Sequence, residues 1–178
     1  MLFVEHPRCR YTRSPLVEVI CQLRFPTILA IDANEPAAFQ ETIRHAFPRY
    51  AVKKDQPAPR ITGLGTPDAK VEQVPPVNNY TFISEDGFWK LNLTKDFISL
   101  STLRYTCWED FASQLDKALA SFIQTYQPDA FTRVGLRYVN AFSRKALGLT
   151  DLLWDDLIQT PYLGILGEPD VDEKEVSK

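Results

Sequence analysis

The sequence predicts an α+β fold with a mixed or antiparallel sheet of about five strands and two main helices packed on one face. Three strand-like segments follow one another over residues 80–104 without a helix between them, whereas parallel sheets alternate strands with helices. Two longer segments have helical spacing. The expected order is therefore β-α-β-β-β-α-β-α. With 178 residues, 44% of them hydrophobic, the chain is expected to form a single domain over residues 1–166, followed by an acidic flexible tail over 167–178.

The first strand is expected over residues 15–25, PLVEVICQLRF, where apolar residues occupy every second position. Val19, Cys21 and Leu23 lie on its core face, and Pro15 and Pro26 mark its ends. Three further strands at 80–84, 88–94 and 97–104 form a meander, in which Asp86-Gly87 is a typical hairpin turn. The last strand covers FTRVGLRYVNAF, residues 131–142.

The first helix is expected from Asn34 as N-cap to the residue before Pro48. The second follows a capping box formed by Thr106 and Glu109, carries an apolar stripe from residue 108 to residue 126, and ends before Pro128. A short amphipathic helix is expected within residues 150–159. Residues 51–79 contain five prolines and two glycines, which predicts a long irregular loop.

Charge and cysteine content restrict the class of protein. The net charge of −3 comes from the last eleven residues, because residues 1–167 carry 18 basic and 18 acidic groups, without the basic surplus typical of duplex-DNA-binding proteins. No apolar run is long enough to cross a bilayer, so no membrane partner is expected. The N-terminal residues lack a secretory h-region, and three isolated cysteines are typical of reduced cytosolic thiols. These features predict a cytoplasmic protein.

Several segments resemble a sporadically distributed family of uncharacterised bacterial and archaeal proteins. The resemblance covers residues 11–164 and is carried by SPLVEVICQLRFP, by the meander with LRYTCWEDF, and by RVGLRYVN. It implies a fold unit without an established activity. Members of the family are longer and continue into a second β-rich portion, so the resemblance implies that this chain is C-terminally shortened.

Charged residues gather on one face of the predicted sheet. If the first and last strands are neighbours and the helices cover one face, the other face carries Glu18, Arg24, Arg133 and Arg137, together with Gln22. One interpretation is a solvated face with ordinary ion pairs. The other is a binding face for an anionic or protein partner. Gly135, between the two arginines of the last strand, favours the second interpretation because a strand glycine often marks a bulge or a close approach.

No catalytic constellation is evident, and no cofactor or metal is expected. His6 and His45 have no second ligand at metal spacing, and Cys107 lies near a helix start without a histidine partner. Trp89, Tyr80 and Phe82 have two interpretations, as core residues or as a platform on which nucleic-acid bases stack.

The most direct functional hypothesis is a binding or assembly module that contacts a protein, either a second copy or another chain, through the face with Glu18, Arg24, Arg133 and Arg137. Two alternatives remain. One is a single-stranded nucleic-acid-binding component of a mobile or defence-related locus. The other is an enzyme whose site is completed by a partner or by a missing C-terminal part.

Overall fold

The computed structural model describes residues 14–63, 70–168, 170 and 171, and within them the chain has the predicted α+β class. A six-stranded sheet, antiparallel throughout, has the strand order β2-β5-β6-β7-β1-β8. Its strands are β1 (Leu16–Arg24), β2 (Arg49–Asp55), β5 (Val77–Ile83), β6 (Trp89–Leu93), β7 (Phe97–Thr102) and β8 (Arg133–Asn140). A separate pair is formed by β3 (Arg60–Thr62) and β4 (Lys70–Glu72).

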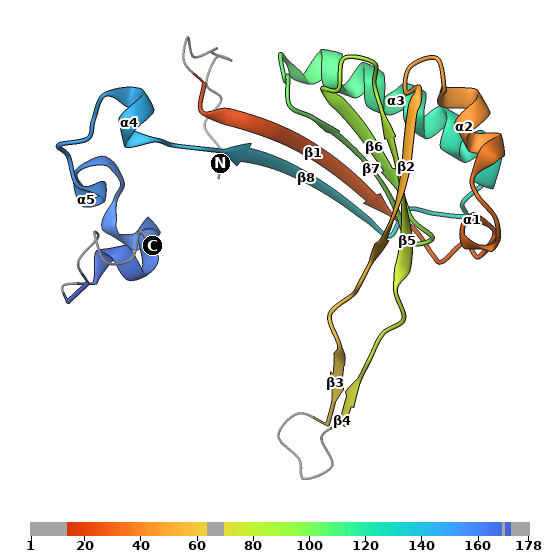
Figure 1. Ribbon diagram of the computed structural model, residues 1–178, viewed down its shortest axis with the longest axis horizontal. Helices are drawn as coiled ribbons and strands as arrows, with labels where there is room; N and C mark the ends of the chain where they lie inside the picture. The colour runs from red at the N-terminus through yellow and green to blue at the C-terminus, as the bar shows by residue number, and fades with distance from the viewer. Residues whose placement is uncertain (1–13, 64–69, 169, 172–178) are drawn as a thin grey trace, which may run out of the picture. The chain divides into compact units, whose positions relative to one another are not determined.

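The helices cover one face of this sheet. They are α1 (Ala30–Ala33), α2 (Ala37–Ile43) and the 19-residue α3 (Trp108–Tyr126). Figure 1 shows α2 and α3 on the same side of the strands. The two main helices on one face and the meander β5-β6-β7 are confirmed, and the number of strands is six instead of about five.

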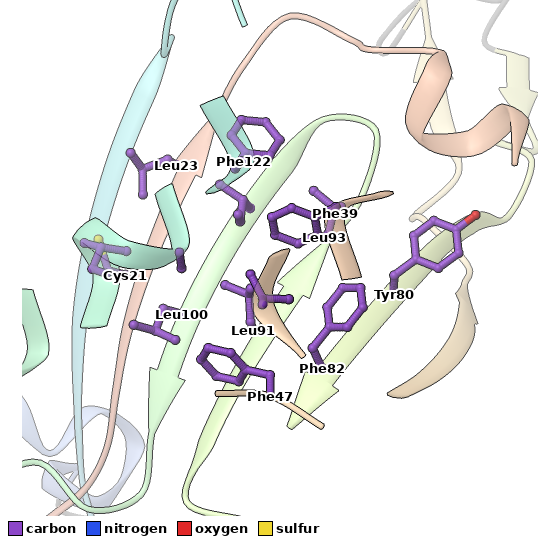
Figure 2. Packing of buried hydrophobic residues seen from close by; sticks show 14 of the residues in the cluster. Cys21, Leu23, Phe39, Phe47, Tyr80, Phe82, Leu91, Leu93, Leu100 and Phe122 are labelled. Atoms are coloured by element: carbon purple, nitrogen blue, oxygen red, sulfur yellow. The ribbon is translucent and has the colours of Figure 1, made fainter. Parts of the chain in front are cut away.

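The core lies between α2, α3 and the covered face of the sheet. Phe122 of α3 is fully buried, and its ring lies 4.8 Å from that of Phe25 and 6.4 Å from that of Phe39, measured between centroids. Phe39 of α2 in turn packs edge-on against Phe82 of β5 at 5.6 Å. Figure 2 shows the rings of Phe39, Phe82 and Phe122 with the leucine side chains of β6 and β7, and Phe25 belongs to the same buried cluster. The predicted apolar stripe of α3 supplies the buried residues Phe111, Leu115, Ala118 and Phe122.

The prediction of one long irregular loop over residues 51–79 is correct only in part, because the described residues of this segment include most of β2, all of β3 and β4, and the start of β5. β2 pairs with β5 along its whole length, from Arg49 opposite Ile83 to Asp55 opposite Val77. The four prolines in the described part of this segment lie between strands: Pro57 and Pro59 separate β2 from β3, and Pro75 and Pro76 precede β5. Proline cannot donate a ladder hydrogen bond, so it interrupts pairing at these points without abolishing it on either side.

Both helix starts differ from the prediction. Asn34 ends α1 in an extended conformation, and α2 begins only at Ala37, after Pro36. The longer helix begins at Trp108 with Cys107 at the N-cap, while the Thr106 hydroxyl donates a hydrogen bond to the Asp110 carboxylate. Thr106 therefore precedes the N-cap position that the capping box assigned to it.

The chain divides into two compact units, Met1–Asn140 and Ala141–Lys178, where a single domain over residues 1–166 was expected. The described residues of the second unit contain four single turns of helix, namely α4 (Arg144–Leu147), α5 (Trp154–Leu157), η1 (Thr160–Tyr162) and η2 (Gly164–Gly167). The amphipathic helix predicted within residues 150–159 is thus reduced to α5. Most of the predicted acidic tail lies outside the described residues.

Local contacts hold the second unit together. The Arg144 guanidinium lies 5.0 Å from the Trp154 ring centroid and donates a hydrogen bond to the Leu152 carbonyl oxygen. None of the described residues of this unit is fully buried. Few apolar side chains are thus shielded from water here, so this unit contributes much less hydrophobic stabilisation than the first. Among the described residues, no helix is long and apolar enough to cross a membrane.

Replacement of Phe122 tests the core assignment. Phe122→Ala removes a fully buried ring and should lower the free energy of unfolding by about 3–5 kcal/mol in urea denaturation. Ile123→Ala is the matched control in the same helical turn, because Ile123 is 45% exposed and its truncation should cost below ~1 kcal/mol. Equal losses in the two variants would contradict the packing described above.

Alkaline unfolding tests the burial of Tyr126. Desolvation by burial, with a smaller contribution from Tyr80, raises the pKa of Tyr126 to about 12. A raised pKa means that the folded protein favours the neutral phenol. The contribution of the neutral Tyr126 phenol to the free energy of unfolding is therefore complete below about pH 10. It is lost as the pH rises from about 10 towards 12. Stability measured across this range should fall less steeply for Tyr126→Phe than for the wild-type chain, and an unchanged slope would contradict the assignment.

Candidate binding face

The four predicted residues share the face of the sheet opposite the helices, here called the open face. β8 pairs with β1, which places Arg133 directly opposite Arg24 and Arg137 opposite Ile20. Val19, Cys21 and Leu23 alternate with these positions and are buried on the helix side. Glu18 lies opposite Val139, one diagonal step from Arg137. The predicted proximity of the first and last strands is therefore confirmed.

Strand register places further basic residues on this face, beyond the four that the sequence predicts. One row across the six strands contains Arg49, Ile83, Lys90, Ser101, Ile20 and Arg137. A second row, four residues further along each strand, contains Lys53, Asn79, Phe97, Arg24 and Arg133. These rows are about 13 Å apart, given the rise per residue of a strand. Each therefore carries three basic side chains.

Between these two rows runs a line of uncharged and mostly small residues, here called the polar row. It consists of Ala51, Thr81, Asn92, Ser99, Gln22 and Gly135. Five inter-strand spacings give it a length of about 24 Å. Ser99 is only 8% exposed although no helix covers it, because the longer Gln22 and Asn92 lie on the strands to either side.

Hydrogen bonds order one half of the polar row. The Asn92 amide nitrogen donates to the side-chain oxygens of Asn79 and Thr81, each at 2.9 Å. Asn79 in turn donates to the Asp55 carboxylate at 2.6 Å, and this bond is the main reason why the pKa of Asp55 is lowered. Lys53 lies 3.4 Å from the same carboxylate. The negative charge of Asp55 is thus already compensated within the sheet.

The arginines at the other end of the face have no such compensation. In the described part of the chain, no carboxylate lies within 4.0 Å of Arg24, Arg133 or Arg137. Glu18 forms no ion pair with Arg137, so the interpretation as a face of ordinary ion pairs is not supported. Arg24 and Arg133 lie directly opposite each other, and like charges in this position destabilise a sheet.

The aromatic residues do not form a base-stacking platform. Tyr80 and Phe82 are at most 3% exposed and lie on the helix side, where Figure 2 shows them within the core. Trp89 packs on Phe111 of α3 at 5.8 Å between ring centroids. Of the two interpretations given to these residues, packing in the core is correct.

The helix-side residues of β8 remain largely exposed. Val134, Leu136 and Tyr138 alternate with the arginines and are 65%, 45% and 44% exposed. Tyr138 also contacts the connection between β7 and α3, because its hydroxyl lies 3.3 Å from that of Tyr105. β8 is therefore an edge strand with an apolar side and a basic side.

Other chemistry is not assembled in the described residues. They contain no group of three or more histidine, cysteine or acidic residues that could hold a metal ion. His45 is exposed beyond α2, Cys21 is buried, and burial raises the pKa of its thiol. An apolar hollow in the second unit, lined by Phe142, Leu147, Trp154 and Leu157, has no titratable side chain in its wall. His6 lies outside the described residues.

Reversing the charge of Arg24 tests the repulsion between the opposed arginines. Arg24→Glu converts a like-charged pair into an opposite-charged pair with Arg133, and should raise the free energy of unfolding by about 0.5–1 kcal/mol. Arg24→Gln removes the repulsion without adding an attraction and should give an intermediate value in the same denaturation series. A decrease in stability for Arg24→Glu would show that the wild-type guanidinium has a stabilising partner.

No family model, no curated protein and no solved structure matches this chain. The family resemblance of its sequence therefore stays a prediction, and the function has to be inferred from the geometry of the open face.

Proposed function

We propose that the chain is a non-catalytic binding or assembly module that recognises an acidic surface of a protein partner through its open face. One observation carries the proposal: three arginines of β1 and β8 lie on this face without a carboxylate within 4.0 Å in the described residues, and two of them, Arg24 and Arg133, are directly opposed. Such an arrangement lowers stability in the free chain. Carboxylates of a partner would neutralise this repulsion and attract the arginines, and both effects would stabilise the complex.

The composition of the whole face supports an anionic partner. Six basic residues flank the polar row, whereas the acids of the face are Glu18 and Asp55, of which Asp55 already has Lys53 beside it. Side-chain amides and hydroxyls between the basic rows offer hydrogen-bond donors and acceptors. Partly buried Ile20 and Ile83 add apolar contact area. This mixture is typical of a protein interface.

A nucleic-acid ligand fits the face less well. Proteins that bind single strands place several aromatic rings where bases can stack on them. On this open face, Phe97 is the aromatic residue contributed by the described strands, since Tyr80, Phe82 and Trp89 lie on the helix side. Phosphate contacts alone would remain available. We therefore favour an acidic protein surface. Nuclease treatment distinguishes a protein ligand from a nucleic acid.

Native mass spectrometry of the tagged chain recovered from its own cells tests the proposal. Wild-type protein should carry a defined protein partner in fixed ratio, unaffected by nuclease. Arg24→Glu combined with Arg137→Glu should reduce its recovery at least about tenfold, because both substitutions reverse charges at the contact. Arg24→Glu alone is expected to be more stable than the wild type, so lost recovery would not reflect unfolding.

The matched control is Lys117→Glu, which makes the same charge change on an exposed position of α3, on the helix side of the sheet. It should leave recovery unchanged. Full recovery by the double arginine variant would place the interface elsewhere. Loss of the co-purifying mass after nuclease treatment would identify the ligand as nucleic acid.

A further inference from the structure

The outer edge of β8 is open. In the sheet order β8 is terminal, so one side of its backbone pairs with β1, and no strand of the described chain pairs with the other side. Unpaired edge amides and carbonyls are a template for another strand, and proteins usually protect such edges with charges that point towards the covered side. The opposite edge has this protection, since Lys54 follows Tyr50 and Val52 on the helix side of β2. β8 has Val134, Leu136 and Tyr138 at the equivalent positions.

Gly135 is not required by the fold. Its conformation is not left-handed, and an added Cβ would lie 3.9 Å from the Gln22 carbonyl oxygen and 4.0 Å from the Arg133 guanidinium, which are ordinary contacts. No bulge occurs at Gly135, because the irregular pairing of β1 with β8 lies between Leu16 and Glu18. Of the two features that a strand glycine often marks, a bulge is thus absent at Gly135, and a close approach by another group is left. The space above Gly135, between Arg133 and Arg137, is open to an external group.

We propose that the outer edge of β8 accepts an extended segment of a partner protein as a seventh strand, with acidic and apolar residues in alternation. This inference rests on the proposed function in that Arg133 and Arg137 belong to the basic face. Apolar side chains of the incoming strand cover Val134, Leu136 and Tyr138, which are 65%, 45% and 44% exposed. Main-chain hydrogen bonds supply affinity, and the alternation of side chains supplies specificity.

Charge complementarity selects the occupant. An acidic side chain placed opposite Gly135 lies diagonal to both Arg133 and Arg137, at about 7–8 Å between Cα atoms, within reach of their long side chains. The missing side chain of Gly135 leaves room for it. A second copy of β8 would instead bring a second pair of arginines beside the first, and this repulsion disfavours self-pairing.

Binding of a defined probe to the full chain tests this inference. The probe is a labelled nine-residue peptide that alternates valine and glutamate, measured by fluorescence anisotropy at about 0.15 M salt. Two further peptides carry N-methyl groups on all valines or on all glutamates. Because backbone amides of alternate residues point to opposite edges of a strand, one of these two peptides should lose binding and the other should retain it.

Variants of the chain locate the contact. Leu136→Lys, and Arg133→Glu combined with Arg137→Glu, should each weaken peptide binding about tenfold. Gly135→Val should weaken it while leaving the protein folded, since a Cβ meets no close neighbour there. The control, Lys70→Glu combined with Lys117→Glu, makes the same charge change at exposed positions of β4 and α3, which do not belong to the open face. It should leave affinity within about twofold of the wild type.

Failure of this inference is distinguishable from failure of the proposed function. Equal binding of both N-methylated peptides would mean that charge alone attracts them, which overturns strand addition and leaves the open face as the binding surface. Absence of peptide binding would also overturn strand addition. The double variant Arg24→Glu, Arg137→Glu could still retain the native partner while peptide binding depends on backbone amides. This pair of results would overturn the proposed function and leave strand addition standing. A concentration-dependent dimer abolished by Leu136→Lys would identify a second copy as the occupant instead.

Discussion

The packing of α3 and α2 on one face of the antiparallel sheet is the constraint on which the remaining structure depends. Phe122 joins the two helices to β1 and β5 through Phe25, Phe39 and Phe82, so the hydrophobic stabilisation of the first unit is concentrated on that side. Alternate residues of the central strands are buried in this core, for example Val19, Cys21 and Leu23 of β1. The residues between them lie on the open face. They do not pack in the core, so their charge and shape can vary without disrupting the fold.

The sequence predicts elements well where burial imposes a strong pattern. β1, the meander and α3 have regular apolar spacing because each faces the core, and their expected ranges agree with the structure within a few residues. β2 was missed because it is an edge strand with little burial, whose alternation of Tyr50 and Val52 is followed by Lys54. The helix starts were misplaced because capping residues are common in turns as well as at N-caps.

The candidate site was partly predictable for the same reason. Glu18, Arg24, Arg133 and Arg137 could be assigned to one face from two strands whose alternation is clear. The polar row could not, because it depends on register among strands far apart in sequence, such as Gln22 opposite Ser99 and Gly135. The direct opposition of Arg24 and Arg133 is likewise a consequence of register. Like charges that oppose each other in a sheet lower its stability, and a function is a common reason for retaining such a pair.

The short strands β3 and β4 extend the β2–β5 pair across a symmetrical interruption. Four residues separate Asp55 from β3, and four separate β4 from Val77, so the lengths on the two sides match and the register is preserved. The Gln56 side chain bridges the gap through a hydrogen bond to the Val74 carbonyl oxygen. Because Asp55 and Val77 are paired, we expect a two-residue turn in place of residues 56–76 to close β2 and β5 as an ordinary β-hairpin.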